Sequence, residues 1–185
     1  AGNNINLLEY AIAGYSAYST KKGQESSRNM AVSAYCKVLP QLNNVSHVAF
    51  IINQFEVMGT DKAVECISSY LTTEPLADPT ARVLAKIATA NALAALEMGV
   101  KSNNDKVTMA SIEALGSVKT YNSSALILPF SSHKNANVVK ASLFALSNLA
   151  DPNSETALMK AAEAAMFSFE PTNASTSLFN YITNI

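Results

Sequence analysis

The side chains best suited to chemistry in this 185-residue sequence are two histidines, two cysteines and fourteen acidic residues. His47 and His133 stand far apart, with no cysteine or carboxylate at the spacing of metal ligands. Because a metal ion needs converging ligands, we expect solvent-facing histidines and no metal site. A nucleophile pair of Cys36 or Cys66 with His47 lacks any accompanying third group or oxyanion donor. We therefore expect no Cys-His active site.

Cys36 and Cys66 lie about one helical hairpin apart in the sequence. Neighbouring helices pack with their axes about 8 to 10 Å apart, which is wider than the usual Cα separation of a disulfide. The sequence therefore favours two free, buried thiols, with a disulfide as the alternative.

Glycoside hydrolysis needs two carboxylates held at a fixed separation in a cleft. The acidic residues of this chain are scattered, and several stand singly on expected helices, where a solvated face is the simpler interpretation: Glu65, Glu97, Glu113, Glu155 and Glu163. The sequence also has no glycine-rich phosphate loop, no GxSxG and no HExxH. We assign no catalytic, cofactor-binding or metal-binding residue and expect no enzyme activity and no cofactor.

Four tyrosines could form an aromatic surface for sugar rings or bases. Tyr10, Tyr15 and Tyr18 lie on one expected helix and Tyr35 on the next. Tyrosines half-buried between terminal helices give the same pattern without a ligand, and the chain has no tryptophan. Packing is the favoured interpretation, and direct carbohydrate binding is the alternative.

Charge and hydropathy limit the partners. Charged residues make up 15% of the chain and the net charge is -1, so no excess of Lys and Arg is available to neutralise phosphates, and we expect no nucleic-acid partner. No apolar stretch approaches the roughly 20 residues of a transmembrane helix. The sequence starts at Ala1 without the features of a signal peptide. We expect that a signal peptide has been removed and that the protein is periplasmic or secreted, with the cytoplasm as the alternative.

A repeat of about thirty residues organises the helices that would carry these side chains. Met58, Ile87, Val118 and Leu149 are equivalent positions, or anchors. Large apolar residues stand three positions before each anchor, at Phe55, Leu84, Leu115 and Leu146, and apolar residues also stand six positions before, at Ile52, Ala81, Ile112 and Leu143. Because residues three or four apart share a helix face, each unit is predicted to begin with a helix whose apolar stripe ends at the anchor.

A short break follows each anchor, at Gly59-Thr60-Asp61, Ala88-Thr89, Thr120-Tyr121-Asn122 and Asp151-Pro152-Asn153. A second helix is then expected to open on a small and a large residue: Ala63-Val64, Ala92-Leu93, Ala125-Leu126 and Ala157-Leu158. The small residue lets two helices approach closely and the large one fills the space beside it. We expect the anchors, and the apolar residues three positions before them, to be buried, and Glu65, Glu97 and Glu155 to be exposed.

The repeat predicts a single domain over residues 1–185. Residues 1–44 form a longer N-terminal capping hairpin, with helices over 5–20 and 26–42 joined by the breaker run 21–24. Residues 45–170 hold four repeat units, and residues 171–185 form a C-terminal cap with a short helix over 174–181. The predicted fold class is all-α: a right-handed alpha-alpha superhelix, or solenoid, of about five helical hairpins.

Two stretches carry a resemblance to HEAT-type repeats: residues 50–71, FIINQFEVMGTDKAVECISSYL, and residues 140–162, KASLFALSNLADPNSETALMKAA. Each resembles the family's helix, its glycine or Asp-Pro turn, and its second helix that opens on a small and a large residue. The family's Asp and Arg ladder is nearly absent, with Asp78, Arg82 and Lys140 as its remnants.

The order of a long first hairpin, FIINQFEVMG and DKAVECISSYL is similar to a HEAT-like region of secreted bacterial proteins that also carry a concanavalin-like keto-disaccharide or glycoside hydrolase domain. This resemblance implies a non-catalytic interaction or scaffold module whose partner is another protein or a covalently linked catalytic domain. The alternatives are a HEAT-like enzyme of the DNA glycosylase or bilin lyase type, and a carbohydrate-binding module.

Overall fold

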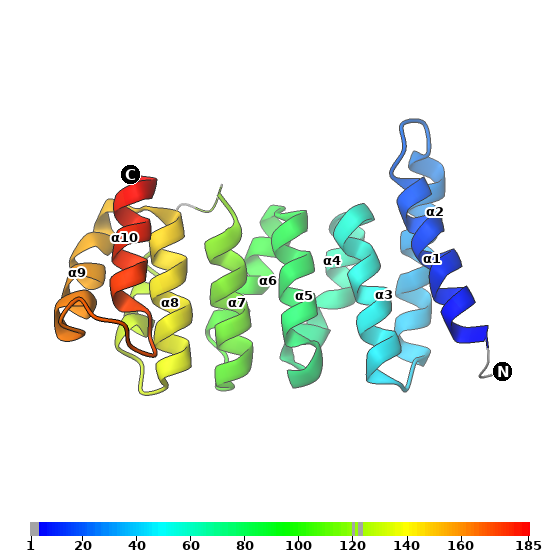
Figure 1. The fold of residues 1–185 in the computed structure, drawn as a ribbon. Coiled ribbons are helices and arrows are strands. Elements are labelled where there is room, and N and C mark those ends of the chain that lie inside the picture. Colours follow the sequence, from blue (N-terminus) through cyan, green and yellow to red (C-terminus); the bar gives the residue numbers. More distant parts are fainter. Residues whose placement is uncertain (1–3, 120, 122–123) are drawn as a thin grey trace. The chain divides into compact units, whose positions relative to one another are not determined.

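A computed structural model describes residues 4–119, 121 and 124–185, and all regular secondary structure in these residues is helical. The prediction of an all-α chain is confirmed. The ten α-helices of the described residues divide between two compact units, residues 1–92 and 93–185, and each unit is considered by itself (Figure 1).

The first unit consists of helical hairpins in two layers (Figure 1). Its elements are α1 (Ile5–Ser19), α2 (Glu25–Val38), the 3-10 helix η2 (Leu39–Gln41), α3 (Val45–Met58), α4 (Asp61–Ile67), the 3-10 helix η3 (Ser68–Thr72) and α5 (Glu74–Ile87). Helix α3 packs between α1 and α5, and α2 packs against α4. Helix α6 (Ala90–Val100) begins at the end of this unit and continues into the next.

The second unit repeats the two-layer arrangement (Figure 1). Its elements are α7 (Asp105–Ser117), the 3-10 helix η4 (Leu128–Ser132), α8 (Ala136–Leu149), the 3-10 helix η5 (Pro152–Ser154), α9 (Glu155–Ala164) and α10 (Ala174–Asn184). Helix α8 packs against both α7 and α10, while η4 and α9 form the other layer.

Asparagines start several of these helices. The side chains of Asn44, Asn104 and Asn135 accept hydrogen bonds from backbone N–H groups in the first turns of α3, α7 and α8. Each satisfies donors that a helix cannot pair internally, which stabilises the helix by about 1 kcal/mol. Helices α5 and α8 are followed by Ala88 and Ala150, which both adopt the left-handed conformation.

The apolar stripe predicted for the first helices is confirmed. Four of its residues, Phe55, Leu84, Leu115 and Leu146, are fully buried. The anchors Met58 and Val118 are buried, as predicted. The prediction is wrong for Ile87 and Leu149, which are half-buried. Ile87 and Leu149 are the last residues of α5 and α8, where the left-handed alanine that follows turns the chain away from the core.

Helices α7 and α8 approach closely at a glycine. A Cβ on Gly116 would lie 2.5 Å from both the Cα and the Cβ of Ala145, which is closer than real carbon atoms pack. The two small residues therefore set the separation of these helices, since any larger side chain at position 116 would push α8 away.

The prediction for the third repeat unit is wrong in its second helix. Ala125 and Leu126 lie in a turn, Ala125 is exposed, and the 3-10 helix η4 follows in place of an α-helix. The turn is closed by the N–H groups of Ile127 and Leu128, which both donate to the carbonyl of Ser124. Pro129 disfavours an α-helical residue immediately before it. Of the preceding break, Thr120 and Asn122 lie outside the described residues.

Both ends of the chain follow the prediction. Helices α1 and α2 with η2 form the expected first hairpin, with the break at residues 20–24. Helix α10 starts at Ala174 as expected but runs to Asn184, because Leu178 and Tyr181 are buried against its neighbours and extend its packed face.

Candidate functional site

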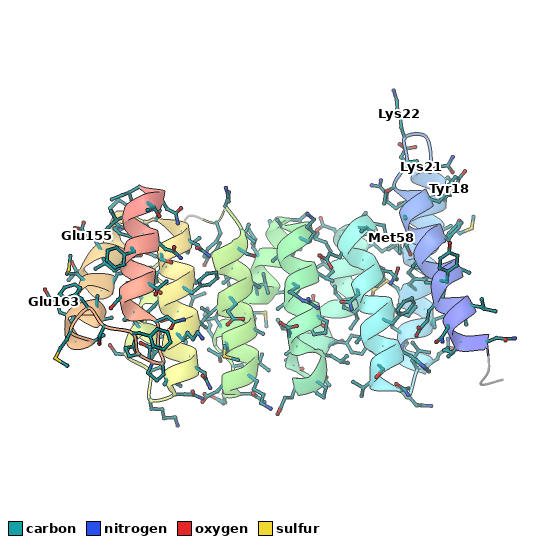
Figure 2. All side chains as sticks on the ribbon, in the orientation of Figure 1. Tyr18, Lys21, Lys22, Met58, Glu155 and Glu163 are labelled. Atoms are coloured by element: carbon teal, nitrogen blue, oxygen red, sulfur yellow. A yellow bond between two sulfur atoms is a disulfide. The ribbon has the colours of Figure 1, made fainter. Side chains whose placement is uncertain are left out.

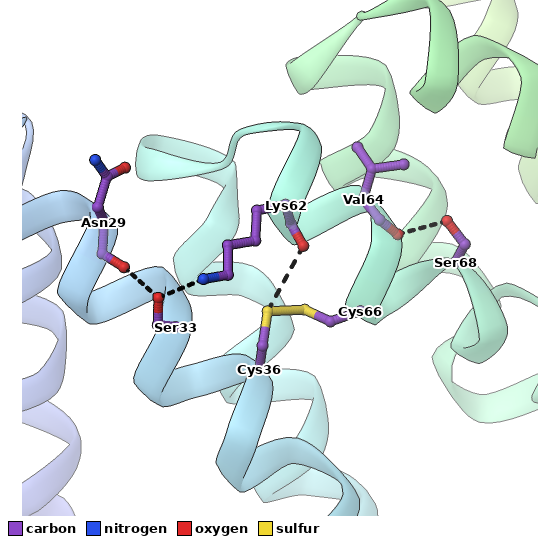
Figure 3. The surroundings of a disulfide bond; sticks show 7 residues. All are labelled: Asn29, Ser33, Cys36, Lys62, Val64, Cys66 and Ser68. Atoms are coloured by element: carbon purple, nitrogen blue, oxygen red, sulfur yellow. Dashed lines mark hydrogen bonds between the residues drawn. A yellow bond between two sulfur atoms is a disulfide. The ribbon is translucent and has the colours of Figure 1, made fainter.

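The two cysteines form a disulfide bond, so the prediction of free thiols is wrong. Cys36 of α2 and Cys66 of α4 are joined with their Cα atoms 5.6 Å apart (Figure 3). The prediction compared a Cα separation with a separation of helix axes. Because Cα atoms lie about 2.3 Å from a helix axis, the facing Cα atoms of helices packed 8 to 10 Å apart come well within reach of a disulfide.

A lysine reinforces this junction between α2 and α4. The Lys62 ammonium donates to the Ser33 hydroxyl at 2.7 Å, and this hydroxyl donates to the carbonyl of Asn29 (Figure 3). The Lys62 carbonyl oxygen lies 3.8 Å from Cys36 Sγ. The disulfide and the Lys62–Ser33 hydrogen bond thus tie α2 of the first hairpin to α4 of the second.

Polar side chains elsewhere also join successive hairpins. In the first unit the Thr89 hydroxyl donates to Asp61. In the second unit the Asn135 amide donates to Asp105 at 2.7 Å, and the Ser124 hydroxyl donates to Asp151 at 2.6 Å. These carboxylates are therefore occupied in structural contacts.

Two carboxylates at the end of the second unit are held in the ionised form. The pKa of Asp151 is lowered by the hydrogen bond from Ser124, with further help from the backbone N–H of Asn153. Burial opposes the ionisation of Glu170, but hydrogen bonds from the N–H groups of Ala174 and Thr172 and from the Thr172 hydroxyl outweigh it and lower its pKa. Since Glu170 binds the N–H of the first residue of α10, it caps that helix.

In the described part of the chain, no two acidic residues line the same one of three cavities, which lie between α7, α8 and α10, between η4 and α9, and between α1, α2 and α3. Glu65, Glu155 and Glu163 are exposed, and Figure 2 shows Glu155 and Glu163 on α9. Glu97 is half-buried, so the expectation that it is exposed is wrong. Glu113 lines a cavity of about 250 Å³ between α7, α8 and α10, and the rest of that lining contains no second acid: Lys140, Ala141, Phe144, Asn173, Thr176, Ser177 and Asn180.

The prediction that both histidines face the solvent is wrong. His47 is half-buried in an apolar pocket of about 140 Å³ between α1, the end of α2 and α3. His133 is half-buried as well, because its Nδ1 accepts from the Asn135 N–H at 3.2 Å and its Nε2 lies 3.9 Å from Asp105. Among the described residues no three His, Cys, Asp or Glu side chains converge on a common metal position.

The tyrosines separate into one packed residue and three exposed ones. Tyr35 is half-buried, lies edge-on against Phe55 and shares a hydrogen bond with Ser16, as predicted. Tyr10, Tyr15 and Tyr18 are 80, 40 and 44% exposed, so the packing interpretation is wrong for them.

A groove of about 440 Å³, with a surface that is more apolar than polar, lies in the second unit between η4 and α9. It is lined by Ser131, Ser132, Asn153, Thr156, Ala157, Lys160, Ala161 and Ala164. Lys160 is the one charged residue of this lining, and the others are small or neutral. No sequence pattern indicates the groove, since small polar residues are common throughout the chain and the repeat predicts an α-helix in place of η4.

No protein-family model matches the chain, and no curated protein matches it. None of the described helices combines the length and apolar character needed to cross a bilayer.

Proposed function

We propose that the chain is a non-catalytic protein-interaction or scaffold module, built as a HEAT-like solenoid of helical hairpins. The observation that carries the proposal is that several acidic side chains of the chain make structural contacts between its helices. Asp61, Asp105 and Asp151 bind neighbouring hairpins, and Glu170 caps a helix, so these acids stabilise joints between elements.

The spacing of the joints supports a stack of repeats. Five side-chain links between hairpins join residues separated by 27 to 30 positions: Ser124 and Asp151, Thr89 and Asp61, Lys62 and Ser33, Asn135 and Asp105, and the disulfide. This is close to the spacing of the anchors. The Ser19–Met58 link between α1 and α3 is longer, at 39 positions. Links of one repeat length are expected where each unit contacts its neighbours along the stack.

The disulfide supports an exported protein, since such bonds persist in oxidising compartments and are rare in the cytosol. Together with the resemblance to secreted bacterial proteins, it favours a periplasmic or secreted module linked to carbohydrate processing, with a protein or an attached catalytic domain as its partner.

The groove between η4 and α9 is the docking surface that we assign to this function. Its Ser, Thr and Asn side chains can hydrogen-bond to the backbone of an extended polypeptide segment, and Lys160 can pair with an acidic side chain of that segment. The occupant we infer is therefore an extended segment with an acidic residue.

Peptides selected from a random display library on the purified chain test the assignment. We expect them to share an acidic residue, and we expect Lys160→Glu or Thr156→Trp to weaken binding of the selected peptides at least tenfold. Lys134→Glu, which reverses an exposed charge outside the groove lining, is the matched control and should leave binding unchanged.

Two results would contradict the proposal. One is peptide binding that survives both groove substitutions. The other is hydrolysis of a carbohydrate or nucleic acid by the purified chain that disappears when a single acidic residue is changed.

A further inference from the structure

Helix α1 carries apolar side chains outward as well as inward, where Ile5 and Ile12 line the apolar pocket. Ser16 and Ser19 are its buried residues, whereas Leu7 is 69% exposed and Tyr10 is 80% exposed. Its one charged residue, Glu9, is half-buried on the inward side, where it lines the apolar pocket. A helix that is apolar on all sides is normally covered on all sides. The described residues of the first unit leave the outward face of α1 uncovered.

Matching residues flank Gly14 on the outward face at three and four positions on either side. The sequence from Tyr10 to Tyr18 reads YAIAGYSAY, with alanine at 11 and 17 and tyrosine at 10 and 18. At 100° per residue, both tyrosines lie 40° from Gly14 around the helix, one on each side, and both alanines lie 60° from it. A Cβ on Gly14 would meet no atom within 4 Å, so the centre of the face is open.

We propose that a second copy of this chain covers the face, in an antiparallel pair of α1 helices related by a two-fold axis beside Gly14. This arrangement places Tyr10 of one copy beside Ala17 of the other, and Tyr18 beside Ala11. Each large ring enters the space left by a small residue, and the two glycines let the helices approach closely. The inference does not depend on the groove between η4 and α9.

The charges around the face are compatible with this pairing. The Lys21 ammonium lies 5.5 Å from the centre of its own Tyr18 ring, and Figure 2 shows Tyr18, Lys21 and Lys22 together at the end of α1. In the antiparallel register the end of α1, with Lys21 beyond it, faces the first turn of α1 of the second copy, which holds no charged side chain, so no like charges meet. No charged group of α1 itself loses its water on the outward side.

The exposed area of the outward face of α1 is consistent with a weak, reversible dimer. The exposed surfaces of Leu7, Tyr10 and Tyr18 with the three small residues amount to roughly 500 Å² per copy, or about 1,000 Å² in total, which is near the lower limit of a specific interface. A dissociation constant on the order of 10 to 100 μM is expected for such an interface.

Sedimentation equilibrium of the purified chain up to about 500 μM tests the pair. We expect a monomer-dimer equilibrium, which Gly14→Gln and the double variant Tyr10→Lys with Tyr18→Lys should abolish. The double variant Tyr10→Lys with Tyr18→Glu should still dimerise, because the antiparallel register sets each new lysine at the level of a new glutamate. Phe169→Lys, at a residue 91% exposed in the second unit, is the control that should leave the dimer intact.

A covalent test uses the otherwise unaltered chain. Because residue 14 lies beside the two-fold axis, Gly14→Cys should cross-link to its own copy under mild oxidation, whereas Ala34→Cys on the exposed side of α2 should not. Monomers at every concentration, or a dimer lost with Phe169→Lys and kept with Gly14→Gln, would overturn the proposal. So would binding of the chain to phosphatidylglycerol vesicles that Gly14→Gln or Tyr10→Lys abolishes while the chain alone stays monomeric.

Discussion

Gly116 and Ala145 lie in direct contact where α7 crosses α8, and a Cβ added to Gly116 would stand 2.5 Å from the Ala145 Cα. The two residues are 29 positions apart, and both neighbours of Gly116 in the core, Leu115 and Ile112, are fully buried. The contact is thus part of the central packing of the second unit and leaves no room for an extra methyl group.

Gly116→Ala should therefore destabilise the protein. Overpacking at such a contact costs about 1 to 3 kcal/mol, which exceeds the gain of about 0.5 to 1 kcal/mol from replacing a helical glycine. The measurement is the urea midpoint of unfolding followed by circular dichroism. Gly14→Ala is the matched control and should raise the midpoint, because its added Cβ meets open space. Equal effects of the two substitutions would contradict this account.

Removal of the disulfide should destabilise the first unit. The bond closes a loop between residues separated by 30 positions, and the loss of chain entropy in the unfolded state corresponds to about 3 to 4 kcal/mol. Cys36→Ala with Cys66→Ala should lower the urea midpoint and speed amide hydrogen exchange in α1 and α2. Exchange in α7 and α8 serves as the internal reference, and acceleration there equal to that in α1 would show that the bond does not act locally.

Acid should weaken the second unit through Asp151 and Glu170. The pKa of each carboxyl is lowered by folding, so each contributes stability that is present above its unfolded pKa, near 4, and lost as the pH falls through its folded value. Thermal melts from pH 7 down to about pH 2 should show a falling midpoint below pH 4. Asp151→Asn with Glu170→Gln should lower the midpoint at pH 7 and flatten its dependence on pH. If the double variant kept the same dependence of the midpoint on pH, these two carboxyl groups would be excluded as its source.

Two serines of the second unit should respond oppositely to alanine. The Ser111 hydroxyl is buried without a hydrogen-bond partner among the described residues, so Ser111→Ala should leave stability unchanged or raise it by about 1 kcal/mol. The Ser124 hydroxyl donates to Asp151, so Ser124→Ala should lower stability by about 1 to 2 kcal/mol. Parallel urea titrations compare them, and a larger loss from Ser111→Ala would refute the assignment.

The helical stripe could be predicted because its signal is periodic. Phe55, Leu84, Leu115 and Leu146 recur at one helix face, and burial of that face is the dominant favourable term in folding. The third unit departs from the pattern because Pro129, which favours η4 over an α-helix, is not one of the repeating apolar positions.

Tertiary contacts were harder to predict. Spacing alone does not tell whether Cys36 and Cys66 face each other across two helices, and an axis separation is a poor guide to the approach of two facing atoms. The outward turn of Tyr10 and Tyr18 was missed because α1 is apolar on every side, which removes the contrast from which a buried face is normally inferred. The groove depends on η4, whose 3-10 form the repeat did not reveal.

The disulfide also determines how the chain would respond to mechanical force. If the two ends of the first unit were pulled apart, the residues between Cys36 and Cys66 could not be drawn out, because the tension would pass through the sulfur atoms. The extension of the pulled chain would therefore be shorter by roughly 100 Å, at about 3.3 to 3.6 Å per residue. Helix α1 would unravel freely, whereas α3 and most of α4 would lie in a closed loop that carries no load.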